Sequence, residues 1–200
     1  MLFMEMLMRK IFLDCGAHKG ESVKKFRQYF DDFEIYSFEA NPQLFEHHKS
    51  LDTSFYGVLV WDRNCSMPFY LDDLDYDGSS VYSHKRNLYK KSEINAEAID
   101  LSEFIQQHFS KNDLIFLKMD IEGAEYVVLN KMIEDNTIFY VDELLIEFHA
   151  NKISLDRSVH VNLVKSLVKF NITPHKWDAL SKNNDVLKYL FSKYQNYGRD

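Results

Sequence analysis

Residues 11–20 read IFLDCGAHKG, and this stretch decides how the chain folds. Apolar residues of strand character lead into Asp14, and Gly16 and Gly20 precede ESVKKFRQYF, whose pattern is helical. Glycines allow the sharp turn that joins a strand to a helix. Because ligands of doubly wound sheets lie beyond the carboxyl ends of the strands, this turn is the first place to look for a binding site.

Apolar and amphipathic runs alternate along the rest of the chain, which predicts a parallel sheet with helices between its strands. In the first half the runs are KIFLDC, ESVKKFRQYF, EIYSFEA, PQLFEHHKSL and FYGVLVW; in the second they are LSEFIQQHF, LIFLKMD, EGAEYVVLNKMI, LLIEFH and VHVNLVKSLVKF. We expect further strands around ITPHKW and VLKYLFSKY. Between the halves, MPFYL and residues 71–95 are poor in helix signal, and we expect a long loop there.

Composition limits the class of protein. With 200 residues and 46% hydrophobic content, a single domain over residues 1–200 can bury one core. The net charge of −7 argues against nucleic acid or an anionic membrane as partner, because both attract clustered Lys and Arg. The densest basic run, KRNLYKK at residues 85–91, is either a solvated face or a clamp for an anionic acceptor.

Cysteine use and hydropathy indicate a cytoplasmic protein. Cys15 and Cys65 are too few for a disulfide framework and lack metal-ligand spacing, so we expect a reducing compartment. The opening MLFMEMLMRK is interrupted by Glu5 and has no small-residue cleavage site, which argues against a signal peptide. No apolar run approaches the roughly 18 residues of a membrane-spanning helix.

The residues of the first turn narrow the choice of cofactor. A dinucleotide turn has the pattern G-x-G-x-x-G, whereas this turn places Asp14 before Gly16 and Gly20. A carboxylate there would repel a diphosphate and would suit S-adenosylmethionine, which carries an amino group and a positive sulfur. Glu39 closes the second strand, where a carboxylate can accept both ribose hydroxyls, although NAD binders share this feature. The alternative for either acid is a helix-capping or solvated carboxylate.

Three segments resemble the FkbM-type S-adenosylmethionine-dependent methyltransferases. DCGAHKGES is similar to the first motif of that family, FEANPQLF to its acidic motif FEPNP, and LKMDIEGAEYVVL with LLIEFH to its segment LKIDxEGAExxVL and the strand after it. The resemblance covers roughly residues 11–149. His18 stands where the family commonly has Asn, and Ala40 replaces the Pro of FEPNP. The resemblance implies a class I methyltransferase fold, which is Rossmann-like: a doubly wound, mostly parallel seven-stranded sheet with helices on both faces.

The resemblance also assigns cofactor contacts. Asp14, Gly16 and Ala17 would line the methionine end of S-adenosylmethionine, with Glu39 on the ribose. Trp61 could cover the adenine ring or simply pack in the core. Ser80 belongs to a serine pair that the family often places near the cofactor, although a polar turn explains it equally well. The full set of candidates is Asp14, Cys15, Gly16, Ala17, His18, Gly20, Glu39, Ala40, Asn41, Trp61, Asp62, Ser80 and Asp120.

Asp120 is the main catalytic candidate because it ends LIFLKMD, whose carboxyl edge would face the cofactor. Glu147 and His149 lie two residues apart in LLIEFH, so they would share one face of their strand. With Asp120 they could hold a divalent metal, Mg²⁺ or Mn²⁺, or deprotonate a hydroxyl. A Glu–His hydrogen bond without metal is the alternative. His84, in the expected long loop, is a further candidate base, and Glu125 would complement a helix dipole.

Methyl transfer to oxygen needs two positioned reactants and the removal of one proton. We therefore expect an O-methyltransferase that acts on a hydroxyl of a sugar, a glycan or another small molecule. Four tyrosines in or beside the expected loop, at positions 70, 76, 82 and 89, would suit a sugar. The alternatives are an NAD-linked oxidoreductase and a catalytically inactive binding module with the same fold.

Overall fold

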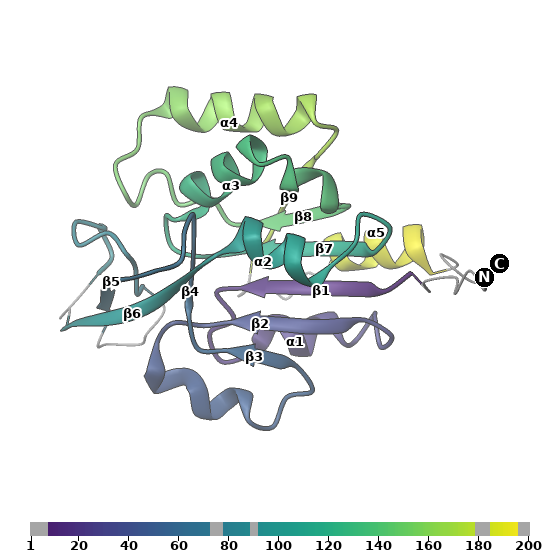
Figure 1. Cartoon of the computed structure of the whole chain (residues 1–200), viewed down its shortest axis with the longest axis horizontal. Helices are drawn as coiled ribbons and strands as arrows, with labels where there is room; N and C mark the ends of the chain where they lie inside the picture. The colour runs from purple at the N-terminus through teal and green to yellow at the C-terminus, as the bar shows by residue number, and fades with distance from the viewer. Residues whose placement is uncertain (1–7, 73–77, 89–91, 179–184, 196–200) are drawn as a thin grey trace.

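The computed structural model describes residues 8–72, 78–88, 92–178 and 185–195. Its main sheet has six strands, all parallel to their neighbours, in the order β3-β2-β1-β7-β8-β9 (Figure 1). The strands are β1 Lys10–Cys15, β2 Glu34–Phe38, β3 Ser54–Tyr56, β7 Leu114–Met119, β8 Glu143–Ile146 and β9 Pro174–Lys176. The predicted α/β fold with a mostly parallel sheet is confirmed, with six strands among the described residues where seven were expected.

Helices cover both faces of the main sheet, as expected. They are α1 Glu21–Phe26, α2 Leu101–His108, α3 Glu125–Glu134, α4 Arg157–Lys169 and α5 Asp185–Tyr194, with 3-10 helices η1 Pro42–His48 and η2 Thr137–Tyr140. Side chains alternate along each strand, so Ile11 and Leu13 pack with α2, α3 and α4, whereas Phe12 packs with α1 and α5. Phe12 stacks on Phe26 of α1 with 3.9 Å between ring centroids. Burying each such side chain stabilises the fold by about 1.5 to 3 kcal/mol.

A second sheet has the order β4-β6-β5 and consists of β4 Leu59–Trp61, β5 Cys65–Leu71 and β6 Ser92–Asp100. It corrects three expectations. MPFYL, which was expected in the long loop, is part of strand β5 and pairs with β6. FYGVLVW is two strands rather than one, because β3 pairs with β2 whereas β4 pairs with β6. The end of the expected loop is strand β6, where buried Ala96 and Ala98 alternate with exposed Asn95 and Glu97 and pair with β5. Figure 1 shows this sheet beside the carboxyl ends of β1 and β2.

Two local predictions are also wrong, and a third is confirmed in a different form. VLKYLFSKY is a helix, since Leu187 and Leu190 lie one turn apart and are both buried against the main sheet. PQLFEHHKSL is helical over Pro42–His48, as expected, but the helix is of the 3-10 type, with Asn41 as its N-cap. Glu147 and His149 do not lie on a strand, because β8 ends at Ile146. The strand around ITPHKW is confirmed as β9.

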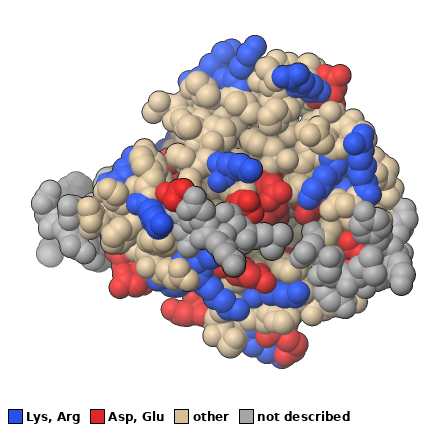
Figure 2. Space-filling model, turned by 180° about the vertical axis from the view of Figure 1, so that it is seen from behind, with Lys and Arg blue, Asp and Glu red and all other residues tan. Residues whose placement is uncertain are grey.

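No helix in the described part of the chain combines the length and the apolar character that a bilayer crossing needs. Charges of both signs mix on the face turned away from the viewer of Figure 1, with acidic side chains near its centre (Figure 2). The described residues of the run at 85–91 do not form a solvated face throughout, because Lys85 is buried. Residues 89–91 of that run lie outside the described residues, as do Tyr76 and Tyr89.

Candidate functional site

The loops after β1, β2, β7 and β8 meet at one edge of the main sheet, because parallel strands present their carboxyl ends together. A cavity of about 550 Å³ opens there, within the size range of cofactor pockets. Its wall includes Gly16, Ala17, His18, Glu39, Asp120 and Glu147. The structure therefore brings together residues that the sequence predicted for cofactor binding and for catalysis.

Gly16 allows the first turn to press against the end of β7. Its φ is +77°, a left-handed conformation, and a Cβ at this position would lie 1.9 Å from the carbonyl oxygen of Asp120. The N–H groups of Gly16 and Ala17 both donate to the carbonyl oxygen of Phe38, at 3.0 and 2.9 Å. The turn is thus fixed between β2 and β7, and only glycine fits at its centre.

Glu39 is buried in the cavity wall and is held by backbone donors. One carboxylate oxygen accepts from His18 N at 2.9 Å, and the other accepts from Asn41 N at 2.8 Å. Burial raises the pKa of Glu39, and the two N–H donors oppose this rise. Each oxygen keeps a lone pair that can accept a hydroxyl. Asn41 itself is buried outside the wall, where its side chain accepts from Gln43 N.

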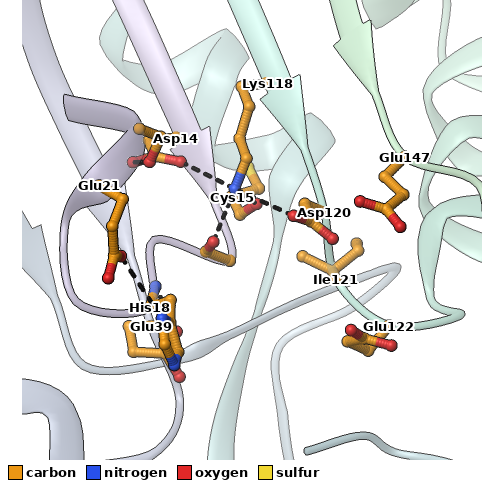
Figure 3. Close-up of polar contacts among 12 residues, drawn as sticks. Asp14, Cys15, His18, Glu21, Glu39, Lys118, Asp120, Ile121, Glu122 and Glu147 are labelled. Carbon is orange, nitrogen blue, oxygen red and sulfur yellow. Dashed lines mark hydrogen bonds and ion pairs between the residues drawn. The ribbon is translucent and has the colours of Figure 1, made fainter. Parts of the chain in front are cut away.

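Asp14 was expected to face the ligand directly. In the structure it lies behind the cavity wall and is not part of it. Its fully buried carboxylate accepts a hydrogen bond from the Ser22 hydroxyl and lies 3.2 Å from the Lys118 ammonium (Figure 3). Asp14 and Lys118 are register partners on adjacent strands, so their side chains leave the same face of the sheet. The lysine also donates to Gly16 O at 2.7 Å. Asp14 therefore supports the turn through Lys118.

Lys118 links the first turn to Asp120. Its ammonium lines the cavity and lies 3.9 Å from the Asp120 carboxylate. Burial would lower the pKa of Lys118, but Asp14 and Asp120 outweigh burial and raise it. The lysine therefore stays charged. Sequence reasoning missed this role, although a lysine inside the otherwise apolar strand LIFLKM was a signal that could have been used.

Asp120 follows β7 and lines the cavity, as predicted. Burial raises its pKa to about 6, against the opposing effects of Lys118 and His149. The Nε2 atom of His149 lies 3.7 Å from an Asp120 oxygen and 3.5 Å from oxygens of both Glu122 and Glu147. Asp120 therefore lies in a cluster of acidic groups around a single imidazole.

His149 is buried and oriented by Glu125. Its Nδ1 lies 2.7 Å from Glu125 Oε1, and the fully buried Glu125 also accepts from the N–H groups of Ile121 and Gly123. Burial would lower the pKa of His149, but Glu125 and Glu147 outweigh burial and raise it to about 10. Glu125 thus does more than complement the dipole of α3, because it fixes the ring that the other carboxylates face.

Glu122 joins this cluster without having been predicted as a site residue. Its side chain accepts from the Lys85 ammonium at 2.7 Å and from Lys152 at 3.4 Å. Its φ of 54° is left-handed, a costly conformation for a residue with a side chain and one that is often found at functional sites. In the described residues, the group whose geometry could hold a metal ion is Asp120, Glu122 and His149, which differs from the expected set of Asp120, Glu147 and His149.

Several predicted residues lie outside the cavity wall. Trp61 packs against the core of the small sheet, and Asp62 pairs with Arg63 at 2.9 Å. Ser80 donates to Glu122 O at 2.7 Å, which helps to position the loop after β7. His84 is exposed, with Nε2 3.2 Å from Ile153 O. Cys15 and Gly20 are also absent from the wall, and burial raises the pKa of the Cys15 thiol.

A family model described as the Methyltransferase FkbM domain matches residues 14–198. No curated protein matches the sequence. Among solved structures, the crystal structure of a xanthine dehydrogenase from Bacillus halodurans matches at 9% sequence identity and a TM-score of 0.40, covering 96% of this chain and 45% of that chain. The chain thus spans less than half the length of that structure.

Proposed function

Because the chain belongs to the FkbM methyltransferase family, we propose that it transfers a methyl group from S-adenosylmethionine to a hydroxyl of a sugar, a glycan or another small molecule. Family membership supports methyl transfer and the donor. The observation that carries the finer proposal is a single cavity whose wall holds both Glu39, beside the glycine turn, and Asp120. One compartment of about 550 Å³ can then hold the donor next to a group that accepts a proton.

The wall suits S-adenosylmethionine better than a dinucleotide. Glu39 can accept ribose hydroxyls with its remaining lone pairs, and Leu59 and Phe69 supply apolar surface for a base. Asp120 and Glu147 add carboxylates that attract a cationic sulfur and repel a diphosphate. Gly16 lets the backbone come close to the ligand, where a Cβ would collide with Asp120. These residues therefore fit the donor that the family uses.

The donor supplies an activated methyl group, so the residues of this chain have to orient the acceptor and take one proton. A carboxyl group whose pKa is about 6 is mostly ionised at neutral pH, yet it holds a proton better than an ordinary aspartate. Asp120 can therefore accept the proton of a hydroxyl as the new bond to carbon forms. Glu147 is more exposed and can bind a second hydroxyl of the same acceptor.

Donor binding is tested by calorimetric titration with S-adenosylhomocysteine and, separately, with NADH. We expect S-adenosylhomocysteine to bind and NADH not to bind, and we expect Glu39→Gln to weaken the first by tenfold or more. Glu97→Gln, an exposed carboxylate of β6, is the matched control and should bind like the wild type. Binding of NADH alone would contradict the assignment and would favour an oxidoreductase.

Acceptor chemistry is tested by incubating the protein with labelled S-adenosylmethionine and a panel of monosaccharides, oligosaccharides and small phenols. We expect label to enter a hydroxyl and to form an ether that survives mild base, whereas a methyl ester would not survive. Asp120→Asn should lower the turnover by 10²-fold or more while affinity for S-adenosylhomocysteine, which has no cationic sulfur, stays unchanged. Transfer only to amines, or equal transfer by the variant, would contradict the O-methyltransferase proposal.

A further inference from the structure

We propose that Asp120, Glu122 and His149 bind a divalent cation of the Mn²⁺ type at the edge of the cavity, where Asp120 and Glu122 line the wall and His149 lies behind it. One carboxylate oxygen from each acid and a ring nitrogen of the histidine all lie within 4.8 Å of one another. The three residues come from the loop after β7 and the loop after β8, which meet at the carboxyl edge of the sheet. The set includes Glu122 in place of the Glu147 expected from sequence.

His149 provides the observation that points to a ligand. The residue is 2% exposed, and within the described ranges its Nε2 makes no hydrogen bond. This atom faces Asp120 and Glu122, whose nearest oxygens lie 3.7 and 3.5 Å away. A buried ring nitrogen without a hydrogen bond costs free energy unless something binds it. A cation here would bind the nitrogen and both carboxylates, with Glu122 shared between the ion and the ammonium groups of Lys85 and Lys152.

The other side of the ring has the support that metal-binding histidines usually have. Nδ1 lies 2.7 Å from Glu125, which is fully buried and is itself held by the N–H of Gly123. A carboxylate on Nδ1 keeps the proton on that nitrogen, so the proton that a cation would displace is the one on Nε2. Glu125 is therefore a positioning residue for the proposed site.

The distances allow a cation with little rearrangement. Two ligand atoms that are each about 2.1 Å from an ion lie about 3 Å apart when adjacent and about 4.2 Å apart when opposite. The separations of 3.5 and 3.7 Å fall between these limits. Small rotations of the carboxylates would therefore be enough to close the site around an ion.

The charges around the site also favour a dication. Five carboxylates surround three lysine ammonium groups and the imidazolium of His149, so one negative charge remains, and a divalent ion that displaces the Nε2 proton adds the one positive charge that balances it. The carboxylates are those of Asp14, Asp120, Glu122, Glu125 and Glu147, and the lysines are Lys85, Lys118 and Lys152. A divalent ion neutralises this excess at the point where the carboxylates converge.

The mixture of ligands indicates the kind of ion. Carboxylates suit Mg²⁺, Ca²⁺ and Mn²⁺, whereas imidazole suits first-row transition metals. Mn²⁺ accepts both, so we take it as the probe. If the proposed methyl transfer is correct, an ion here would bind the acceptor oxygen in the same cavity and lower the pKa of its hydroxyl. The binding of the ion itself does not depend on that reaction.

The test is a titration of chelator-treated protein with Mn²⁺, followed by the loss of the free-ion signal in electron paramagnetic resonance, without donor or acceptor. We expect one site per chain and binding at least tenfold weaker in Glu122→Gln and in His149→Gln. Glu97→Gln should bind like the wild type, and circular dichroism should show that each variant is folded. Wild-type protein with bound Mn²⁺ should also show a nitrogen coupling from the imidazole in pulsed measurements, which needs no variant.

Three outcomes would overturn the proposal: no binding at millimolar Mn²⁺, binding without a nitrogen coupling, or unchanged binding in Glu122→Gln together with its loss in Glu147→Gln. Titration with S-adenosylhomocysteine in EDTA separates this test from that of the proposed function. Donor binding in EDTA without any Mn²⁺ binding would remove the ion and leave the methyltransferase proposal intact.

Discussion

The two halves of the cavity use acidic side chains in opposite ways. In the donor-side turns, residues 16–18 and 39–41, the carboxylate of Glu39 accepts two backbone N–H groups. In the acidic loops, residues 120–122 and 147–149, three carboxylates face one imidazole nitrogen at 3.5 to 3.7 Å. A backbone donor cannot rotate away or change its charge, whereas a side-chain neighbour can do both. The first half is therefore held in a fixed shape, whereas the groups of the second half can rotate and change their charge.

Lys118 joins the two halves. Its ammonium lies between Asp14, which supports the first turn, and Asp120, which opens the acidic loops. The geometry of the donor-side turns thus depends on a charge that the acidic loops share. Substitutions that remove a contact between the two halves can show how far the stability and the binding of each half depend on the other.

The largest expected effect comes from Lys118→Met, which removes the shared charge. Asp14 would remain buried without its partner, and breaking such a pair costs about 3 to 5 kcal/mol of unfolding free energy. Urea unfolding would measure the loss. Asp14→Asn combined with Lys118→Met should recover part of the stability, because no buried charge is then left alone. Equal stability of the single variant and the wild type would show that the pair does not hold the halves together.

Gly16→Ala should disrupt the contact between the halves at the donor-side turn, where Gly16 meets the backbone of Asp120. Its Cβ would collide with the carbonyl oxygen of Asp120, and its φ would stay left-handed. We expect a loss of about 3 kcal/mol and no measurable donor binding. Ala17→Gly, at the next position, introduces no collision and should cost about 1 kcal/mol or less. Similar melting temperatures for the two variants would contradict the tight fit.

A comparison of Glu39→Gln with Glu147→Gln tests the difference in role directly. In Glu39→Gln the new side-chain amide would turn an NH₂ group toward a backbone N–H, so we expect a loss of about 1 to 3 kcal/mol together with weaker S-adenosylhomocysteine binding. Glu147 is partly exposed, and Glu147→Gln should leave stability within about 0.5 kcal/mol and affinity for S-adenosylhomocysteine, which has no cationic sulfur, unchanged while methyl transfer falls. Unfolding and calorimetry on both variants would show whether the effects separate in this way.

A carboxylate at the amino-terminal edge of the sheet, opposite the cavity, serves as a reference. We expect its substitution to change stability less than the substitutions above. Glu143, the first residue of β8, contacts His175, Lys193 and Tyr194. Burial would raise its pKa, but these three partners outweigh burial and lower it to about 2. The native pKa is depressed, so the contribution is present above the unfolded value near 4.5 and is lost as the pH falls toward 2.

Because the partners are partly exposed, we expect the Glu143 contribution to be about 1 to 2 kcal/mol. Unfolding of wild type and Glu143→Gln should therefore differ at pH 6 and converge near pH 2. A difference that grows toward acid would have the wrong sign for a depressed pKa.

Much of the fold follows from local pattern. Long apolar strands such as LIFLKM and amphipathic runs such as VHVNLVKSLVKF were assigned correctly, because burial repeats every two residues in strands and about every 3.6 in helices. The predictions that are wrong concern segments whose apolar pattern is short or fits both a strand and a helix. VLKYLFSKY has apolar residues at both spacings, and packing of Leu187 and Leu190 on the sheet selects the helix. FYGVLVW divides because its two halves pair with strands that are far apart in sequence.

Site residues were predictable from the sequence where they directly follow a strand. Gly16, Glu39 and Asp120 each follow a strand, and parallel strands bring such positions to one edge. Partners from distant segments were not predictable. Lys85 reaches Glu122 from a segment that looked like a solvated loop, and His84, which looked like a candidate base, lies exposed beside Ile153.

The sequence by itself determined which residues end the strands and therefore which carboxylates reach the carboxyl edge, because side-chain alternation and turn chemistry are local properties. Only the tertiary structure decided how those charges are paired. The register of β1 against β7 places Lys118 on Asp14, and the approach of two loops sets His149 against Asp120 and Glu122. Electrostatic energy depends on distance through space rather than along the chain, so the acid of one half is held by fixed backbone donors, whereas the acids of the other half converge on one imidazole.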